Sequence, residues 1–229
     1  MSFSLPRLPR ISTTSHLAIS TEARYGLVAG LLALSIAVNI LASPARWAFI
    51  VVSACEGAAL IVARAALRTT AVVTIAVAAA ALISVVLASL PNETGRLGAA
   101  VVDGMLLVAI PVTIGIRVRR SFYVNVQTIL AAISVYLVLG LFFAVLDSIL
   151  STVTGERFFA QVADADSGQY TYYSFITLCT VGYGDLSPGS AVARALAVTE
   201  ALIGQLYLVT VIAVVVGNLG RPRQRSGQT

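Results

Sequence analysis

The sequence predicts an all-α membrane protein with six membrane-spanning helices, and with a short re-entrant helix and a loop between the fifth and the sixth. Three observations predict this fold class. Hydrophobic residues make up 58% of the 229 residues and charged residues only 11%, against about 25% charged in soluble domains. Six apolar runs approach the roughly 20 residues that a spanning helix needs. Mean hydropathy is +0.92.

The first four spans form one expected domain, residues 25–120, which follows an N-terminal arm at residues 1–24. The arm has no apolar core, so we do not expect it to be a cleavable signal peptide. The four spans are rich in Ala, Gly and Ser, which permits close helix packing in lipid. Pro111 predicts a kink in the fourth span. We expect the four helices at roughly 25–41, 45–63, 71–90 and 97–116.

A second expected domain covers residues 121–220 and is followed by a short tail at 221–229. Its helices are expected at roughly 126–150, 170–179 and 191–219, and the one at 170–179 is too short to span. The segment 151–170 carries a surplus of acidic residues, which either raises the local cation concentration or is merely solvated. Its charged residues are Glu156, Arg157, Asp164 and Asp166.

Arginine placement predicts the orientation in the membrane. All 15 basic residues are Arg, and 11 of them fall in segments that lie inside if both termini are cytoplasmic. The positive-inside rule supports that orientation. The composition, with Arg but no Lys and much Ala and Val, indicates a bacterial source and hence the bacterial inner (plasma) membrane. Helix-end placement explains the net charge of +5, so we expect lipids and no nucleic acid as partners.

Between the last two spans lies Thr180-Val181-Gly182-Tyr183-Gly184, the TVGYG loop. A bare cation needs oxygens in place of its water shell, and stacked rings of backbone carbonyls can supply them. Successive carbonyls point the same way only if backbone handedness alternates, which Gly182 and Gly184 tolerate. We expect Val181 and Tyr183 to turn away from the ions and brace the loop. Thr180 can add a hydroxyl oxygen.

The loop, the aromatic run before it, the Asp185-Leu186-Ser187-Pro188 segment and the following apolar helix resemble the potassium channel family. The resemblance implies a potassium-selective channel, with K⁺ bound along the TVGYG loop as its filter. It implies neither a cofactor nor enzymatic activity. Because one chain supplies one loop and the family's pore needs four, it also implies a homotetramer.

Residues around the loop take supporting roles by the same resemblance. Tyr172 and Tyr173 stand where family members place an aromatic cuff against the filter tyrosine, although an interfacial aromatic belt is the alternative. Thr177 and Cys179 would lie at the inner end of the short helix.

Some family members carry a Glu behind the filter that pairs with the Asp at its exit. The matching position here is Ile176, so this carboxyl pair is absent. Asp185 must therefore find another partner, such as the hydroxyl of Tyr172 or water. Gating at the filter itself could differ from that of those relatives.

The last span contains the gating candidates. Gly204 resembles the family's gating hinge, or else it allows close helix packing. Glu200 is an ionisable group in a membrane helix, which is a functional-site hypothesis by default, or else it anchors the short helix through a hydrogen bond. Val211, Ile212 and Val215 either form a hydrophobic constriction or face lipid.

The six-span plan resembles voltage-gated channels, but the fourth span lacks their Arg ladder. Its basic residues sit only at its ends, and Asp103 lies inside it, so we expect weak or no voltage dependence. Glu56 and Asp103 have no basic residue at their depth in their own helices. Each is therefore protonated, watered or paired across helices. Proton sensing and a structural hydrogen bond both remain open for them.

Two other function classes compete with a channel. One is a potassium uptake transporter subunit, but those relatives join several pore repeats in one chain and have degenerate filters, and this sequence has neither feature. The other is a non-conducting membrane sensor or accessory subunit. Because only residues 221–229 follow the last span, we expect no cytoplasmic ligand-binding domain. We therefore expect gating to use the membrane part or another subunit.

Overall fold

The computed structural model describes residues 21–43, 45–64, 71–88, 90, 93–118 and 126–218. Over these residues the secondary structure is helical apart from one isolated β-bridge between Phe159 and Pro188. Most of the expected arm and the whole of the expected tail lie outside them. The helices are α1 (Thr21–Ala42), α2 (Arg46–Arg64), α3 (Ala71–Ala88), α4 (Glu93–Val118), α5 (Val126–Thr154), α6 (Ser167–Leu178) and α7 (Ala191–Asn218).

Four helices contain stretches that are long and apolar enough to cross a membrane. These stretches are Arg24–Ala42 in α1, Leu97–Ile114 in α4, Val126–Thr154 in α5 and Ala191–Val214 in α7. The apolar stretches of α2 and α3 are shorter, Trp47–Ala63 and Ile75–Leu87. With 12 residues, α6 is about 18 Å long and cannot span a hydrocarbon core of about 30 Å. All seven helices lie where the sequence predicts them, and the protein is a helical membrane protein.

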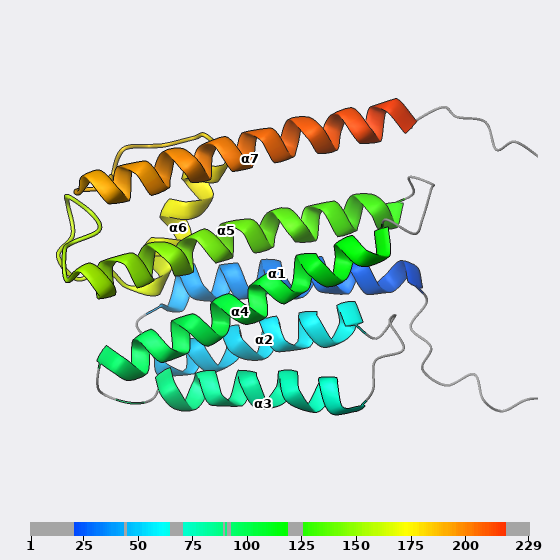
Figure 1. Cartoon of the computed structure of the whole chain (residues 1–229), viewed down its shortest axis with the longest axis horizontal. Coiled ribbons are helices and arrows are strands. Elements are labelled where there is room, and N and C mark those ends of the chain that lie inside the picture. The colour runs from blue at the N-terminus through cyan, green and yellow to red at the C-terminus, as the bar shows by residue number, and fades with distance from the viewer. Residues whose placement is uncertain are drawn as a thin grey trace, which may run out of the picture.

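The long helices run alternately in opposite directions side by side (Figure 1). At one side of the molecule α7 packs on α5 and α6, and at the other side α3 packs on α2 and α4. The start of α1 and the end of α7 lie at the same end of the molecule (Figure 1). α6 lies near the opposite end, between α7 and α1.

A single apolar core joins the first helices to α5. Its fully buried members include Leu32 of α1, Leu60 of α2 and Ile110 of α4, packed with Val138 of α5. Pro111 lies inside α4, beside Thr113, whose hydroxyl donates to the Ala109 and Ile110 carbonyls. α4 continues to Val118 although Pro111 has no N–H to donate to the Leu107 carbonyl.

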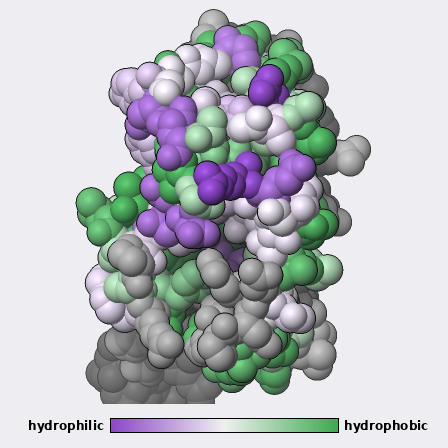
Figure 2. Space-filling model, turned by 90° about the vertical axis from the view of Figure 1, so that its left-hand side faces the viewer, coloured by the Kyte–Doolittle hydropathy of each residue, from purple (hydrophilic) through white to green (hydrophobic). Residues whose placement is uncertain are grey.

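The end of the molecule near α6 carries the two segments that flank the TVGYG loop. Hydrophilic side chains gather over this end, with hydrophobic ones toward its edges (Figure 2). Ala160 N donates to Ser187 O at 2.9 Å, and Gly189 N donates to Phe158 O at 2.8 Å. These bonds tie the segment before α6 to the segment after the loop.

The first turn of α6 is held by the end of α1. Ser167 Oγ donates to Asn39 Oδ1 at 2.8 Å, and Gly168 N donates to Ser43 Oγ at 2.7 Å. A Cβ on Gly168 would lie 2.7 Å from the carbonyl oxygen of Asn39. The small residue therefore lets two helices more than 120 positions apart in sequence touch through their backbones.

We expect Gly168→Ala to lower the free energy of unfolding by about 1–3 kcal/mol, because the added methyl overpacks a contact with rigid backbone. Gly30→Ala is the matched control, since a Cβ on that α1 glycine meets nothing within 4 Å. Denaturant unfolding of both variants in detergent measures the difference. Equal stability of the two would contradict this tight contact between α1 and α6.

Candidate functional site

The site begins with the N-terminus of α6, which Asp166 caps. The Asp166 carboxylate accepts a hydrogen bond from Gln169 N at 2.9 Å, and the Gln169 side chain accepts one from Asp166 N at 3.0 Å. This reciprocal pair is a capping box, and it fixes where the helix starts. Of the acidic residues in the segment 151–170, Asp166 thus has a structural role. Glu156 and Asp164 are exposed.

Directly after α6, the backbone of the TVGYG loop alternates in handedness. Thr180, Gly182 and Gly184 have φ of 57°, 50° and 81°, whereas the residues between them do not have positive φ. The prediction for the two glycines is confirmed, and Thr180 adds a third left-handed residue that the sequence did not indicate. Positive φ at a β-branched residue is an outlier. Such strain persists only where the surroundings impose it.

The surroundings that impose it lie at the end of α6. Ile176 O accepts from Val181 N at 2.8 Å and from Gly182 N at 3.1 Å, while Thr177 O accepts from Thr180 N at 2.9 Å. These three bonds fold the start of the loop back onto the helix. The backbone of the loop is therefore positioned by α6 itself.

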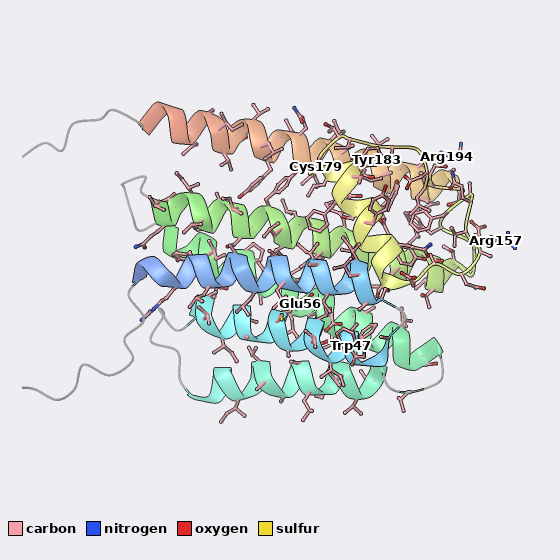
Figure 3. All side chains as sticks on the ribbon, turned by 180° about the vertical axis from the view of Figure 1, so that it is seen from behind. Trp47, Glu56, Arg157, Cys179, Tyr183 and Arg194 are labelled. Atoms are coloured by element: carbon pink, nitrogen blue, oxygen red, sulfur yellow. The ribbon has the colours of Figure 1, made fainter. Side chains whose placement is uncertain are left out.

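One face of the loop is open within a single chain. Val181 is 51% and Tyr183 72% exposed. A Cβ built on Gly182 or Gly184 meets nothing within 4 Å. Tyr183 and Cys179 lie close to α7 at the α6 end of the molecule, whereas Glu56 lies deep among the other helices (Figure 3). The loop thus has neighbours on the side of α6 and none on its other side among the described residues.

The exit of the loop is tied to α6 by one side-chain hydrogen bond. Tyr172 Oη donates to Asp185 Oδ2 at 2.8 Å. The Tyr172 hydroxyl, expected as one partner of Asp185, is therefore bound to it. The bond to the carboxylate holds the pKa of Tyr172 above its ordinary value, and the nearby negative charge acts in the same direction.

Tyr173 differs from the expectation of a cuff against Tyr183. It is buried, and its ring packs edge-on against Phe158 and Phe159 at centroid distances of 5.6 and 5.1 Å. Tyr170 joins the same cluster. Adjacent residues on a helix point about 100° apart, and within this chain Tyr172 bonds Asp185 whereas Tyr173 packs on Phe158 and Phe159. The second tyrosine instead anchors the segment before α6.

Below the loop, two tyrosines that the sequence analysis missed connect the helices. Tyr136 Oη donates to Leu178 O at 3.2 Å and lies 3.4 Å from Cys179 Sγ. Its ring stacks on Tyr207 at 5.9 Å, and Tyr207 Oη donates to Ala132 O at 2.7 Å. Cys179 is exposed. The sequence contained a signal for this contact, because α5 and α7 are apolar helices that each carry one tyrosine.

Behind the loop, Glu200 of α7 is fully buried and contacts α6. Ser174 Oγ lies 2.5 Å from Glu200 Oε1 and 2.6 Å from Gly140 O of α5. The anchoring hydrogen bond considered for Glu200 is therefore present. Asp147 of α5, also fully buried, lies near it. Asp147 was not predicted as a functional residue, although an acid inside an apolar span was itself a signal.

The other gating candidates lie along α7. A Cβ on Gly204 would approach Leu178 O to 2.6 Å, so this glycine permits close packing of α7 on α6. Ile212 is 60% exposed and Val211 partly exposed within the chain. The side chain of Val215 lies outside the described residues.

Glu56 and Asp103 are brought together between the helices. They are 3% and 7% exposed and line one cavity of about 80 Å³. Ser35 of α1 donates to Glu56 at 3.3 Å, and Ser84 of α3 donates to Asp103 at 2.6 Å. The cavity also reaches α6, through Ser167, Tyr170 and Thr171 among others.

The comparisons with known proteins bear on the C-terminal part of the chain. A family model described as an ion channel matches residues 131–220. The matched segment runs from α5 through α6 and the TVGYG loop to the end of α7, which is the part that holds the site. No curated protein matches the chain significantly. The part of the chain from α5 to α7 is therefore similar to ion channel domains, and α1–α4 lie outside the match.

We expect Asp185→Ala to lower the pKa of Tyr172, because the variant removes both the hydrogen-bond acceptor and the negative charge that oppose phenolate formation. An ultraviolet absorbance titration, with Tyr172→Phe subtracted to isolate this tyrosine, measures the change. Asp164→Ala, at an exposed acid on the segment before α6, is the control and should leave the Tyr172 titration in place. An unchanged titration in Asp185→Ala would mean that the bond does not form.

Proposed function

We propose that the protein is a potassium-selective channel in which ions pass in single file along backbone carbonyls of the TVGYG loop. The observation that carries this proposal is the positive φ at every second residue from Thr180 to Gly184. Carbonyls stacked along one axis replace the hydration shell of K⁺. The K⁺ ligands are the carbonyl oxygens of Thr180, Val181, Gly182 and Tyr183. No catalysis or cofactor is part of this function.

The helix before the loop adds to the stabilisation of a cation. α6 ends at Leu178, two residues before Thr180. The C-terminal end of a helix carries a partial negative charge, which favours a cation nearby. Thr180, whose hydroxyl oxygen is a further possible ligand, lies at the same end of the loop.

The proposal includes four copies of the chain around one axis, because a single row of carbonyls cannot surround an ion. The open face of the loop supports this, since Val181 and Tyr183 remain exposed in one chain. Several large apolar side chains of α7 are also exposed, and neighbouring copies or lipid would cover them. They are Leu202, Leu206, Val209 and Ile212.

In the membrane, we propose six spans with α6 re-entrant between the fifth and the sixth. The alternating directions of the long helices support this, and so does the start of α1 at the same end as the end of α7 (Figure 1). The Arg distribution supports cytoplasmic termini. The composition supports a bacterial inner membrane. Non-helical backbone of the loop at membrane depth is tolerated when protein buries it.

Weak or absent voltage dependence is part of the proposal. The stretch Leu97–Ile114 of α4 contains no basic residue and does contain Asp103. Voltage-driven opening requires several charges that move through the field, each worth about 2.3 kcal/mol per 100 mV. A helix without basic residues in its membrane-crossing stretch lacks the row of positive charges that such a mechanism moves.

We expect Gly182→Ala to abolish the preference for K⁺ over Na⁺, because a left-handed φ of 50° at this position strains any residue with a Cβ. Gly155→Ala is the matched control. Gly155 also has positive φ, 65°, and also has open space around it, but it lies outside the loop. The measurement is rubidium uptake into liposomes that contain the purified protein, with excess K⁺ or Na⁺ as competitor and Ba²⁺ as blocker.

The outcomes separate the function classes. Rapid, barium-sensitive flux in the wild type and in Gly155→Ala, together with lost selectivity in Gly182→Ala, supports the channel. No flux in the wild type favours a non-conducting sensor or accessory subunit. Slow, saturable uptake favours a transporter subunit. If Gly182→Ala leaves the preference for K⁺ over Na⁺ unchanged, the TVGYG loop is not the filter.

We further propose that Glu56 and Asp103 make conductance depend on pH. Both carboxyls are buried on one cavity, and a change in their charge would act on α6 because the cavity reaches it. The groups that face them are the hydroxyls of Ser35 and Ser84, with Tyr170 as the other titratable group on the cavity wall. No basic residue occurs among the described residues that line it.

For Glu56→Gln we expect the response of flux to pH to fall by about half or more, because one of two interacting carboxyls no longer titrates. Single-channel or liposome flux recordings between acidic and neutral pH measure it. Glu156→Gln, at an exposed acid before α6, should keep the wild-type response. If Glu56→Gln also keeps it, the two buried carboxyls have only a structural role.

A further inference from the structure

Three helices meet behind the TVGYG loop around two buried carboxyl groups. Glu200 of α7, Asp147 of α5 and Ser174 of α6 are all 0% exposed. Glu200 Oε2 and both carboxyl oxygens of Asp147 have no hydrogen-bond partner within the described part of the chain. A buried ionised carboxylate without partners costs several kcal/mol or more. Simultaneous ionisation of Glu200 and Asp147 is therefore unfavourable in this buried site.

Hydrogen counting at Ser174 identifies the charge state of Glu200. A serine hydroxyl has one proton to donate and lone pairs to accept. Ser174 Oγ lies 2.6 Å from Gly140 O and 2.5 Å from Glu200 Oε1. A backbone carbonyl can only accept, so the single Ser174 proton goes to Gly140. The proton between Ser174 and Glu200 must then belong to Glu200, whose O–H donates to Ser174 Oγ.

The ionised alternative satisfies fewer atoms. If Ser174 donated to a Glu200 carboxylate, the hydroxyl and the Gly140 carbonyl would face each other at 2.6 Å with no proton between them. The charge on Glu200 would also lie near Asp147, with Tyr173 as the other titratable group beside both. The neutral acid gives each of the two short contacts a proton.

We infer that Glu200 is a positioning residue for the TVGYG loop, acting as a neutral carboxylic acid that donates to Ser174 and so fixes α6 between α5 and α7. This inference rests on the proposed channel function for its effect on conduction. Ser174 lies two residues before Ile176, whose carbonyl holds Val181 N and Gly182 N. The position of the loop therefore follows from the proton on Glu200.

A second contact one turn along α7 makes the arrangement rigid. Because Gly204 has no Cβ, Leu178 O can lie close to α7. A Cβ at Gly204 would be 2.6 Å from that oxygen. On the other side of α6, a Cβ on Gly140 would lie 2.5 Å from the Phe175 ring. With both flanks packed this closely, α6 has no room to take up a longer or differently directed bond to Glu200.

Infrared spectroscopy tests the proton directly. The difference spectrum between the wild type and Glu200→Gln at neutral pH should contain the C=O stretch of one carboxylic acid, with Asp147 cancelling because it is present in both proteins. A pair of carboxylate bands in its place overturns the inference. This measurement needs the reconstituted protein but no ion flux, so it stands if the proposed conduction fails.

Variants test the positioning role. Glu200→Gln should keep rubidium flux, since an amide N–H donates to Ser174 as the acid does. Glu200→Ala should reduce flux about tenfold, and Ser174→Ala should do the same because it removes the acceptor. Thr199→Ala is the control on the neighbouring residue, whose exposed side chain bonds only its own helix at Ala195 O. Flux lost in Glu200→Gln as fully as in Glu200→Ala overturns the inference.

A double-mutant cycle separates this result from general damage. The unfolding free energies of Glu200→Ala and Ser174→Ala should be non-additive, because each variant removes the same bond. Additive effects overturn the inference. Absence of flux from the wild type contradicts the proposed function alone, since the infrared band and the unfolding cycle are read without conduction.

Discussion

Two adjacent amide groups, those of Val181 and Gly182, donate to one carbonyl oxygen, that of Ile176, at 2.8 and 3.1 Å. For both to reach it the chain must turn back at once after α6, and this turn places Thr180 at φ 57°. A left-handed β-branched residue costs of order 1–3 kcal/mol. The loop can keep that conformation only while the carbonyl at the end of α6 stays in place, so everything that holds α6 also holds the loop.

Three neighbours hold α6 at three heights. α1 contacts its start at Gly168, α5 its middle through the Gly140 carbonyl and Ser174, and α7 its end, where Gly204 meets Leu178. Each contact depends on a residue without a Cβ, because close approach of backbone is how helices in lipid gain packing energy. The contact with α1 also means that the helices outside the ion channel match bear directly on the helix that carries the loop.

The sequence predicted the elements whose signal is local. Apolar runs predicted the helices. The requirement for alternating backbone handedness predicted the left-handed conformation of Gly182 and Gly184. What depends on side chains distant in sequence was predicted less well. Tyr173 packs in a cluster with Phe158 and Phe159. Ser174 contacts Gly140 and Glu200, which lie 34 and 26 positions away in the sequence. Strain at Thr180 follows from hydrogen bonds to α6, which no local pattern of residues reveals.

The open face of the loop bears on how copies of the chain come together. The exposed side chains of α7 are largely apolar, and lipid tails satisfy such groups about as well as another protein does. Main-chain carbonyl oxygens differ from these apolar side chains, because hydrocarbon offers them neither a hydrogen-bond donor nor an ion. In the proposed assembly, the carbonyl oxygens of residues 180–183 from four copies face one another, and their like partial charges are compensated by the ions between them.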